Sequence, residues 1–197
     1  MDPIETQRLL IRTFQLDDLG SLHRLLDVEL AHVDLGDQGA MSLEARRRYL
    51  EWNILSAEQF AALHQPPYGD RAVVLKANGE LVGSVGLVPA LNQFERLPGF
   101  AAEVNHPWRG FTTPEVGLYY AIFPAHQRQG YAYEAAGALI NYAFTRLGLK
   151  RLIAETNYDN LASIAVMRKL GMRIDRNPDP EPAWLQVVGV IYNPHLE

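Results

Sequence analysis

Cysteine is absent from the sequence of 197 residues. Its absence excludes a disulfide framework, thiolate zinc sites, iron–sulfur clusters and a cysteine nucleophile. The 6 histidines are scattered and show no H-E-x-x-H or similar metal-ligand spacing. We therefore expect no metal, and a covalent acyl-enzyme would need Ser, Thr or Lys as its nucleophile.

Basic residues are also few, because 18 Lys and Arg stand against 23 Asp and Glu and give a formal net charge of -5. Proteins that bind the phosphate backbone of nucleic acids usually carry an excess of Lys and Arg, which displaces counterions. No nucleic-acid partner is expected, although the count leaves room for a local basic pocket.

Long hydrophobic runs are lacking as well. The longest largely apolar stretch, 116–125, is far shorter than the ~20 residues that span a bilayer. The first residues, 1–6, are polar and acidic and are not followed by the apolar run of a signal peptide. These features predict a cytoplasmic protein that does not associate with membranes.

Internal repeats, low-complexity tracts and Gly/Ser linkers are absent too, so residues 1–197 are expected to form a single domain. Alternating strand and helix patterns predict a mixed α/β sheet with helices on its faces. The expected strands are 9–14, 72–76, 80–88, 115–123, 151–155, 172–175 and 184–192, and the expected helices are 17–26, 42–58, 129–147 and 161–170.

Local patterns add further expectations. Asn78 and Gly79 between two strands are typical of a type I′ hairpin turn, which needs positive φ angles. The run Arg46-Arg47-Arg48 suggests an anion site, but such runs are usually solvated helix faces, and we favour that interpretation. The last strand is apolar on both faces, which predicts burial and is compatible with a homodimer.

A long segment, 89–113, separates the third and fourth expected strands. Segments of this length inside a compact domain are usually functional or mobile. Its aromatic residues either line a pocket or cover the core as a lid, and the sequence favours neither alternative. These residues are Phe94, Phe100, Trp108 and Phe111.

The most informative stretch is 123–136, where a strand ends and a helix begins. Backbone N–H groups at a helix start are unpaired, and the helix dipole adds partial positive charge, so a pyrophosphate fits there. Gly130 allows close approach of a ligand, and Arg128 can add a charge-assisted contact. An ordinary strand-to-helix turn that contains a glycine is the alternative.

This turn resembles the Gln/Arg-x-x-Gly-x-Gly/Ala signature of the GNAT superfamily of acyl-CoA-dependent N-acetyltransferases. Other stretches between Thr6 and about Ile174 resemble family motifs in the same order, and two of them are similar to the RimL/RimJ-type branch. The matching stretches are Thr6-x-Arg8-Leu9-x-Ile11-Arg12, Glu115-Val116-Gly117-Leu118, Gln127-x-x-Gly130-x-Ala132, and Asn160-x-x-Ser163 followed by Leu170-Gly171-Met172.

The resemblance implies a GNAT-like, mostly antiparallel sheet that splays between its fourth and fifth strands, here 115–123 and 151–155. Acetyl-CoA, as co-substrate, would lie in that wedge and pair with the backbone of the fourth strand. Gly117 inside this strand fits a bulge or a close backbone approach. The residues expected to bind the coenzyme are Tyr120, Ile122, Gln127, Arg128, Gln129, Gly130, Tyr131, Ala132 and Asn160.

The resemblance also implies acetyl transfer to a primary amine, either a protein N-terminus or a small molecule. Because the sequence lacks cysteine, we expect direct transfer in a ternary complex. An α-amino group has a pKa near ~8, so a strong base is unnecessary. Glu115 is the expected base, and Ser163 is expected to donate to the leaving sulfur. Both also fit purely structural roles, and Asn160 fits both a helix cap and a residue that positions the pantetheine arm.

Two other functions compete with catalysis. One is a non-catalytic, CoA-binding regulatory module of the same fold. The other is a nucleotide binder, which is disfavoured because the turn lacks Gly-x-Gly-x-x-Gly. The acceptor pocket is expected from the first two helices, segment 89–113 and the last hairpin, where Glu103, Asp179 and Glu181 either attract a cationic acceptor or are simply solvated.

Overall fold

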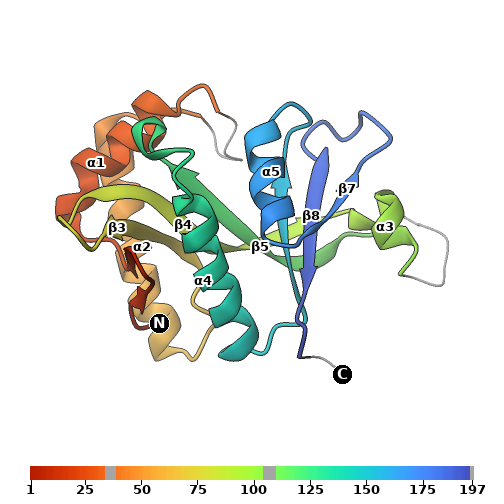
Figure 1. Ribbon diagram of the computed structural model, residues 1–197, viewed down its shortest axis with the longest axis horizontal. Coiled ribbons are helices and arrows are strands. Elements are labelled where there is room, and N and C mark those ends of the chain that lie inside the picture. Colours follow the sequence, from red (N-terminus) through yellow and green to blue (C-terminus); the bar gives the residue numbers. More distant parts are fainter. Residues whose placement is uncertain (34–38, 104–109, 196–197) are drawn as a thin grey trace.

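The computed structural model describes residues 1–33, 39–103 and 110–195. Within these ranges eight strands form one open sheet, in the order β1-β2-β3-β4-β5-β6-β8-β7 (Figure 1). All neighbouring strands are antiparallel except β5 and β6. The strands are β1 (Ile4–Glu5), β2 (Leu9–Arg12), β3 (Gly69–Leu75), β4 (Leu81–Asn92), β5 (Thr113–Ile122), β6 (Arg151–Thr156), β7 (Arg173–Arg176) and β8 (Val187–Tyr192).

Helices cover both faces of this sheet. Ala136 and Leu139 pack from one face with Leu118 and Leu152 of the sheet. The longer helices are α1 (Leu19–His23), η2 (Arg24–Glu29), α2 (Leu43–Ala62), α4 (Tyr131–Thr145) and α5 (Leu161–Lys169), and the shorter ones are η1 (Leu16–Asp18), η3 (Phe94–Arg96), α3 (Pro98–Ala101) and η4 (Pro124–His126). α4 and α5 form the layer on that face, while α1, η2 and α2 cover the other face around Leu22.

The expected mixed sheet is confirmed, with differences at several boundaries. α2 begins after Ser42 as predicted, because the Ser42 hydroxyl accepts the N–H of Ala45 at 3.2 Å, but the helix continues to Ala62. The turn between β3 and β4 is not type I′, since only Gly79 of the Asn-Gly pair has a positive φ, 74°. The Arg46 side chain is only 2% exposed, so interpreting its basic run as a solvated face is wrong at that residue.

Segment 89–113 is partly regular, because β4 continues to Asn92 and pairs with β5 from Gly83 to Asn92. Phe94 and Phe100 are buried against Leu97 and Ile153, so these two aromatic side chains extend the core. Phe111 is 64% exposed and takes no part in that cluster. Trp108, named in the same expectation, lies outside the described residues.

The last strand, β8, is buried because it lies between β6 and β7. A partner chain is therefore not needed to explain its two apolar faces, and the homodimer stays a prediction. No helix within the described ranges is long and apolar enough to cross a membrane.

The sheet divides between β5 and β6, which are in register as parallel strands only at Gly117 and Ile153. This is the expected wedge; its strands are the fifth and sixth because the short β1 precedes the first predicted strand. Gly117 continues the β4–β5 ladder without a bulge, and a Cβ built there would lie 2.9 Å from Cγ2 of Val88. The glycine is thus explained by the close approach of β4.

Candidate active site

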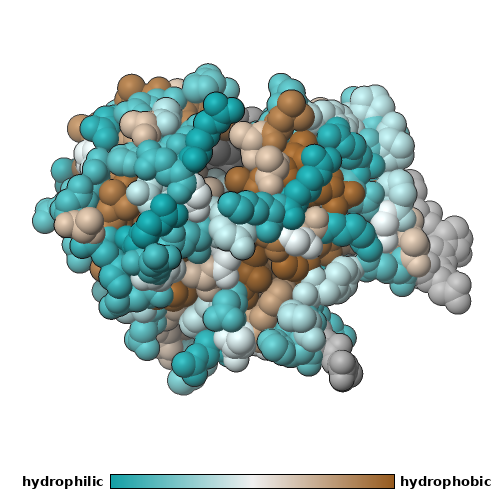
Figure 2. Space-filling model, viewed as in Figure 1, coloured by the Kyte–Doolittle hydropathy of each residue, from teal (hydrophilic) through white to brown (hydrophobic). Residues whose placement is uncertain are grey.

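A cavity of about 1660 Å³ opens at the wedge and reaches both faces of the sheet. One part is lined by the turn before α4 and by the start of α5, and the other by α2 and the ends of β3 and β4. In the space-filling view the surface is hollowed between the turn before α4 and α5 (Figure 2). Segments far apart in the sequence therefore meet in one continuous space.

The turn that precedes α4 has an unusual backbone. Arg128 and Gly130 have φ angles of 60° and 85°, in the left-handed region. The Gln127 side chain folds back and donates to the Ile122 carbonyl at 3.0 Å, which fixes the turn to the end of β5. The first N–H groups of α4, beginning at Tyr131, lack acceptors within the helix, so the turn offers donors to an anion.

Glu134, in the first turn of α4, holds this turn against the N-terminal strands. Its carboxylate accepts the Thr6 hydroxyl at 2.6 Å and the Arg8 N–H and Nε–H at 2.8 and 2.7 Å. Arg8 also donates to the Gln129 carbonyl at 3.0 Å and stacks over the Tyr131 ring. Burial raises the pKa of Glu134, but the hydrogen bonds from Thr6 and Arg8 outweigh burial and lower it. Arg8 belongs to the motif that begins at Thr6, but the sequence did not predict its contact with Glu134.

Ser163 lies in the first turn of α5 and lines the cavity. The Asn160 side chain caps this helix by accepting the N–H of Ser163 at 3.0 Å. The Tyr120 hydroxyl of β5 lies 2.8 Å from Oγ of Ser163 and donates to the Ser163 carbonyl at 3.2 Å. Burial raises the pKa of Tyr120, which keeps its hydroxyl protonated. The hydroxyl of Tyr120 is therefore a neighbour of Ser163, although the sequence analysis predicted only a coenzyme-binding role for Tyr120.

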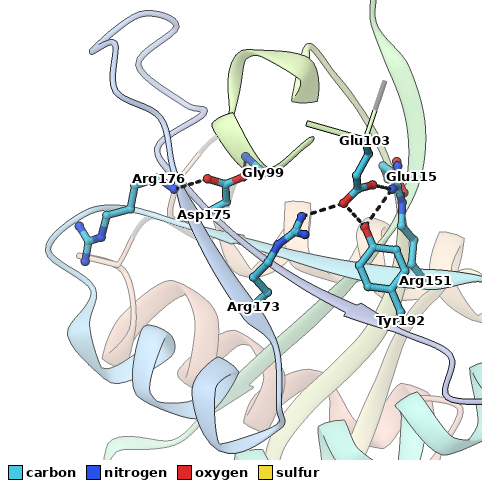
Figure 3. A network of polar contacts seen from close by, with 8 residues as sticks. All are labelled: Gly99, Glu103, Glu115, Arg151, Arg173, Asp175, Arg176 and Tyr192. Carbon is cyan, nitrogen blue, oxygen red and sulfur yellow. Dashed lines mark hydrogen bonds and ion pairs between the residues drawn. The ribbon is translucent and has the colours of Figure 1, made fainter. Parts of the chain in front are cut away.

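Glu115 does not lie with Ser163. Its carboxylate pairs with the Arg151 guanidinium through both oxygens, and Glu115 is absent from the described lining of the large cavity (Figure 3). Arg151 also donates to Glu103, which accepts from Arg173 and from the Tyr192 hydroxyl. The hydrogen bond to Glu115 raises the pKa of Arg151, so the guanidinium stays charged.

This network joins the end of α3 to β5, β6, β7 and β8, and the Asp175 carboxylate adds a hydrogen bond from the Gly99 N–H (Figure 3). Glu103 is thus held by cations of its own chain and does not line the cavity. Burial raises the pKa of Glu103, yet hydrogen bonds from Tyr192 and Arg173 outweigh burial and lower it. Asp179 and Glu181 are also absent from the described cavity lining.

The part of the cavity next to α2 is rich in aromatic side chains. Tyr49 donates to the Asp70 carboxylate, and the Tyr49 and Trp52 rings lie 5.8 Å apart. Three of the aromatic lining residues, Tyr49, Trp52 and Phe60, belong to α2, and the cavity is also lined by Tyr68, Tyr119 and Trp184. The first two helices and the last hairpin contribute as expected, and the described part of segment 89–113 contributes Pro89, Ala90, Leu91 and Asn92.

Among the side chains that the structure describes, no group of three or more His, Cys, Asp or Glu is placed to hold a metal ion.

The sequence analysis did not single out Glu155 of β6, which lines the cavity. Burial raises the pKa of Glu155, and a hydrogen bond with the Asn92 side chain partly offsets the rise. The sequence feature that could have identified Glu155 is an acidic residue at the end of an otherwise apolar strand.

Comparison with known proteins agrees with this architecture. Residues 8–173 match the acetyltransferase (GNAT) domain family. The uncharacterized N-acetyltransferase YnaD of Bacillus subtilis (strain 168) is 28% identical over 174 residues, which cover 86% of this chain and 82% of YnaD.

Solved structures share the fold at lower identity. The GNAT-family acetyltransferase from Bacillus anthracis superimposes with a TM-score of 0.67 at 23% identity, covering 98% of this chain and 99% of that chain. RimL, a ribosomal L7/L12 α-N-protein acetyltransferase solved in complex with coenzyme A, gives a TM-score of 0.64 at 17% identity and covers 96% of both chains. With its family match extending over most of its length, this chain belongs to the GNAT family of acetyltransferases.

Proposed function

We propose that the protein transfers an acetyl group from acetyl-CoA to a primary amine in a ternary complex. The observation that carries the proposal is the cavity through the β5–β6 wedge, which joins the turn before α4 to the aromatic space beside α2. Two substrates that enter from opposite faces of the sheet would meet at the wedge. Transfer then needs no covalent intermediate on the protein, in keeping with the absence of cysteine.

The residues at the wedge fit coenzyme A. The left-handed turn at Arg128 and Gly130 leaves backbone donors and a cationic side chain for the pyrophosphate. The expected phosphate contacts are Gln127, Arg128, Gln129, Gly130, Tyr131 and Ala132, all within the predicted turn. Backbone groups around Tyr120 and Ile122 would pair with the pantetheine amides, as an added strand does.

At the reacting end, Ser163 is the proposed donor to the leaving sulfur. Its Oγ lies 2.8 Å from the Tyr120 hydroxyl, and this contact holds the Ser163 side chain at the wedge. Asn160 holds the helix start that presents Ser163. Glu115 was expected to be the base, but its bidentate pairing with Arg151 favours a structural role in the network of Figure 3.

The acceptor is proposed to be a protein N-terminal α-amine or a small-molecule amine. The sequence resemblance to the RimL/RimJ-type branch, together with the fold shared with RimL, supports a protein N-terminus. The aromatic lining beside α2 supports an acceptor that carries an apolar group next to its amine.

Release of free CoA from acetyl-CoA tests the proposal. The acceptors are short peptides with free N-termini, the same peptides with blocked N-termini, and small primary amines. Because the protein lacks cysteine, a thiol reagent reports only the CoA that is released. We expect release above hydrolysis with at least one free amine and none with its blocked counterpart.

Two results would contradict acetyl transfer. CoA release that does not depend on any amine would leave only thioester hydrolysis. A rise in melting temperature with acetyl-CoA, but no acetylated product by mass spectrometry, would favour the non-catalytic CoA-binding module.

A further inference from the structure

The face of the sheet that carries α2 holds a carboxylate set back from the wedge. Asp70 of β3 pairs with Gly86 of β4, and Gly86 pairs with Tyr119 of β5, so the three residues lie in one row across the sheet. Side chains directly opposite each other in antiparallel strands share a face, and Tyr119 packs with the cluster of α1 and α2. Asp70 therefore lies on the face where the acceptor is proposed to enter.

The Asp70 side chain leans along this row toward the wedge. A Cβ built at Gly86 would lie only 2.8 Å from Oδ1 of Asp70, so the carboxylate covers the space that a side chain at position 86 would fill. Oδ2 accepts the Tyr49 hydroxyl, which stays protonated because burial raises the pKa of Tyr49. A carboxylate offers about four acceptor positions, so Asp70 can also accept N–H groups of a ligand.

The surroundings of Asp70 suit a cationic ligand. Tyr49 and Trp52 of α2 line the cavity with their ring centroids 5.8 Å apart, and aromatic faces attract ammonium groups. The Arg46 guanidinium lies over the Tyr49 ring but forms two hydrogen bonds with Asp27, so its positive charge is already balanced. A cation next to Asp70 therefore meets a carboxylate and two aromatic rings.

The position of Asp70 sets the length of the acceptor. Among the described lining residues only Asp70 and Glu155 carry a carboxylate; Glu155 belongs to β6, which borders the wedge, whereas Asp70 lies two strands away from β5. Neighbouring strands are about 4.8 Å apart, so the Asp70 backbone lies roughly 10 Å from β5. Because the carboxylate leans toward β5 and a hydrogen bond spans about 3 Å, a nitrogen bound to Asp70 would lie roughly 6–9 Å from an amine at the wedge.

We propose that Asp70 selects acceptors that carry a second positive charge, an inference that rests on the proposed function. The reacting amine lies at the wedge, an apolar chain crosses the aromatic lining, and the second ammonium group binds the Asp70 carboxylate. An extended chain rises by about 1.25 Å per bond, so about four to six carbon atoms between the two nitrogens bridge the distance. Asp70 thus takes the role that the sequence left open for Glu103, Asp179 and Glu181, the attraction of a cationic acceptor.

The substrate class is a compound with two amines, which is either a small diamine or a peptide whose first residue is lysine. The test compares acceptors that differ only in the second charge: cadaverine with pentylamine, and a short peptide that begins with lysine with the same peptide that begins with norleucine. The second nitrogen is protonated at neutral pH, since the pKa of such an amine is near ~10.4. We expect the wild-type kcat/KM to be about 10–100-fold higher for the dication in at least one pair, as one charge-assisted hydrogen bond gives.

Asp70→Asn tests the assignment, because its side chain keeps the size of aspartate and can still accept the Tyr49 hydroxyl but carries no charge. We expect KM for the dication to rise until the two members of the pair differ by less than about threefold in kcat/KM, with kcat within about twofold of the wild type. Asp17→Asn, at an exposed aspartate outside the described cavity lining, removes the same charge and should leave the preference unchanged. Both acceptors are measured on one preparation, so a smaller folded fraction of a variant does not alter their ratio.

A preference confined to the diamine pair would identify a small-molecule acceptor, and one confined to the peptide pair would identify a peptide; either supports the role of Asp70 if Asp70→Asn removes it. A preference that survives in Asp70→Asn, or that is lost equally in Asp17→Asn, would overturn the assignment. So would equal wild-type kcat/KM for both members of each pair, a result that needs no variant. If the wild type acetylates no amine, the proposed function itself fails, whereas equal transfer to both members refutes only the role of Asp70.

Discussion

The buried ion pair between α2 and η2 gives the sharpest stability prediction. Arg46 donates to both carboxylate oxygens of Asp27, at 2.8 and 2.7 Å, and the two side chains are only 2% and 1% exposed. Asp27 also accepts the Met41 N–H at 2.7 Å, so the pair fixes the chain that enters α2. Arg46→Met would leave the Asp27 charge buried without its cation.

Removing one partner of a buried pair costs about 3–5 kcal/mol of unfolding free energy. For a chain of this size, each kcal/mol lowers the melting temperature by about 2–4 °C. We therefore expect Arg46→Met to melt about 6–20 °C below the wild type. Urea unfolding followed by circular dichroism should show a lower midpoint with an unchanged slope.

The neighbouring arginine provides a matched control, because Arg47 is exposed on the same helix. Arg47→Met should change the unfolding free energy by less than about 0.5 kcal/mol. The double variant Asp27→Leu with Arg46→Met, which removes both charges, should recover much of the loss. A cost below about 1 kcal/mol for Arg46→Met, or an equal cost for Arg47→Met, would refute the reasoning.

Three further predictions concern the candidate site. Gly130→Ala places a Cβ at a φ of 85° and should weaken acetyl-CoA binding by about tenfold in calorimetry, whereas Gly137→Ala, inside α4 with its nearest contact at 3.8 Å, should not. Ser163→Ala should lower kcat by about 10²-fold without a matching change in the acetyl-CoA Kd. Because the folded-state pKa of Glu134 lies below its ordinary value of 4.5, its contribution to stability is present above pH 4.5 and is lost as pH falls through the lower value; Glu134→Gln should flatten this loss in urea midpoints.

Each of these predictions has a contradicting result. Equal acetyl-CoA affinities of Gly130→Ala and Gly137→Ala would mean that the left-handed turn does not shape the phosphate site. An unchanged kcat in Ser163→Ala would remove it as the donor to sulfur. Identical acid profiles of the wild type and Glu134→Gln would mean that its hydrogen bonds to Thr6 and Arg8 add no pH-dependent stability.

Local sequence patterns predicted the elements that depend on local physics. Ser42 marked a helix start because its side chain satisfies an N–H of the first turn. Small residues at helical spacing, such as Ala136 and Ala143, form the face of α4 that packs on the sheet, which follows from the same local periodicity. The wedge between β5 and β6 was predicted only from the family resemblance. The pairing of Gly117 with Ile153, where the two strands are in register, depends on the assembled sheet.

Contacts between distant segments could not be predicted from the sequence. Arg46 was expected in solvent because a run of like charges usually is, but its partner Asp27 lies 19 residues away on another helix. Glu115 was assigned from its motif position, whereas its partner Arg151 is 36 residues further along the chain. A motif fixes the strand on which a carboxylate lies, and only the tertiary fold fixes which cation it meets.

The divergence of β5 and β6 also bears on aggregation. Strand edges whose backbone groups are not matched to a neighbouring strand act as templates for other chains, and proteins usually shield them. Here two such edges face each other across the wedge beyond Gly117 and Ile153, inside a cleft flanked by α4 and α5. An unfolded chain cannot add to these edges without entering the cleft. The opening in the sheet can therefore persist without becoming a site of intermolecular β-pairing.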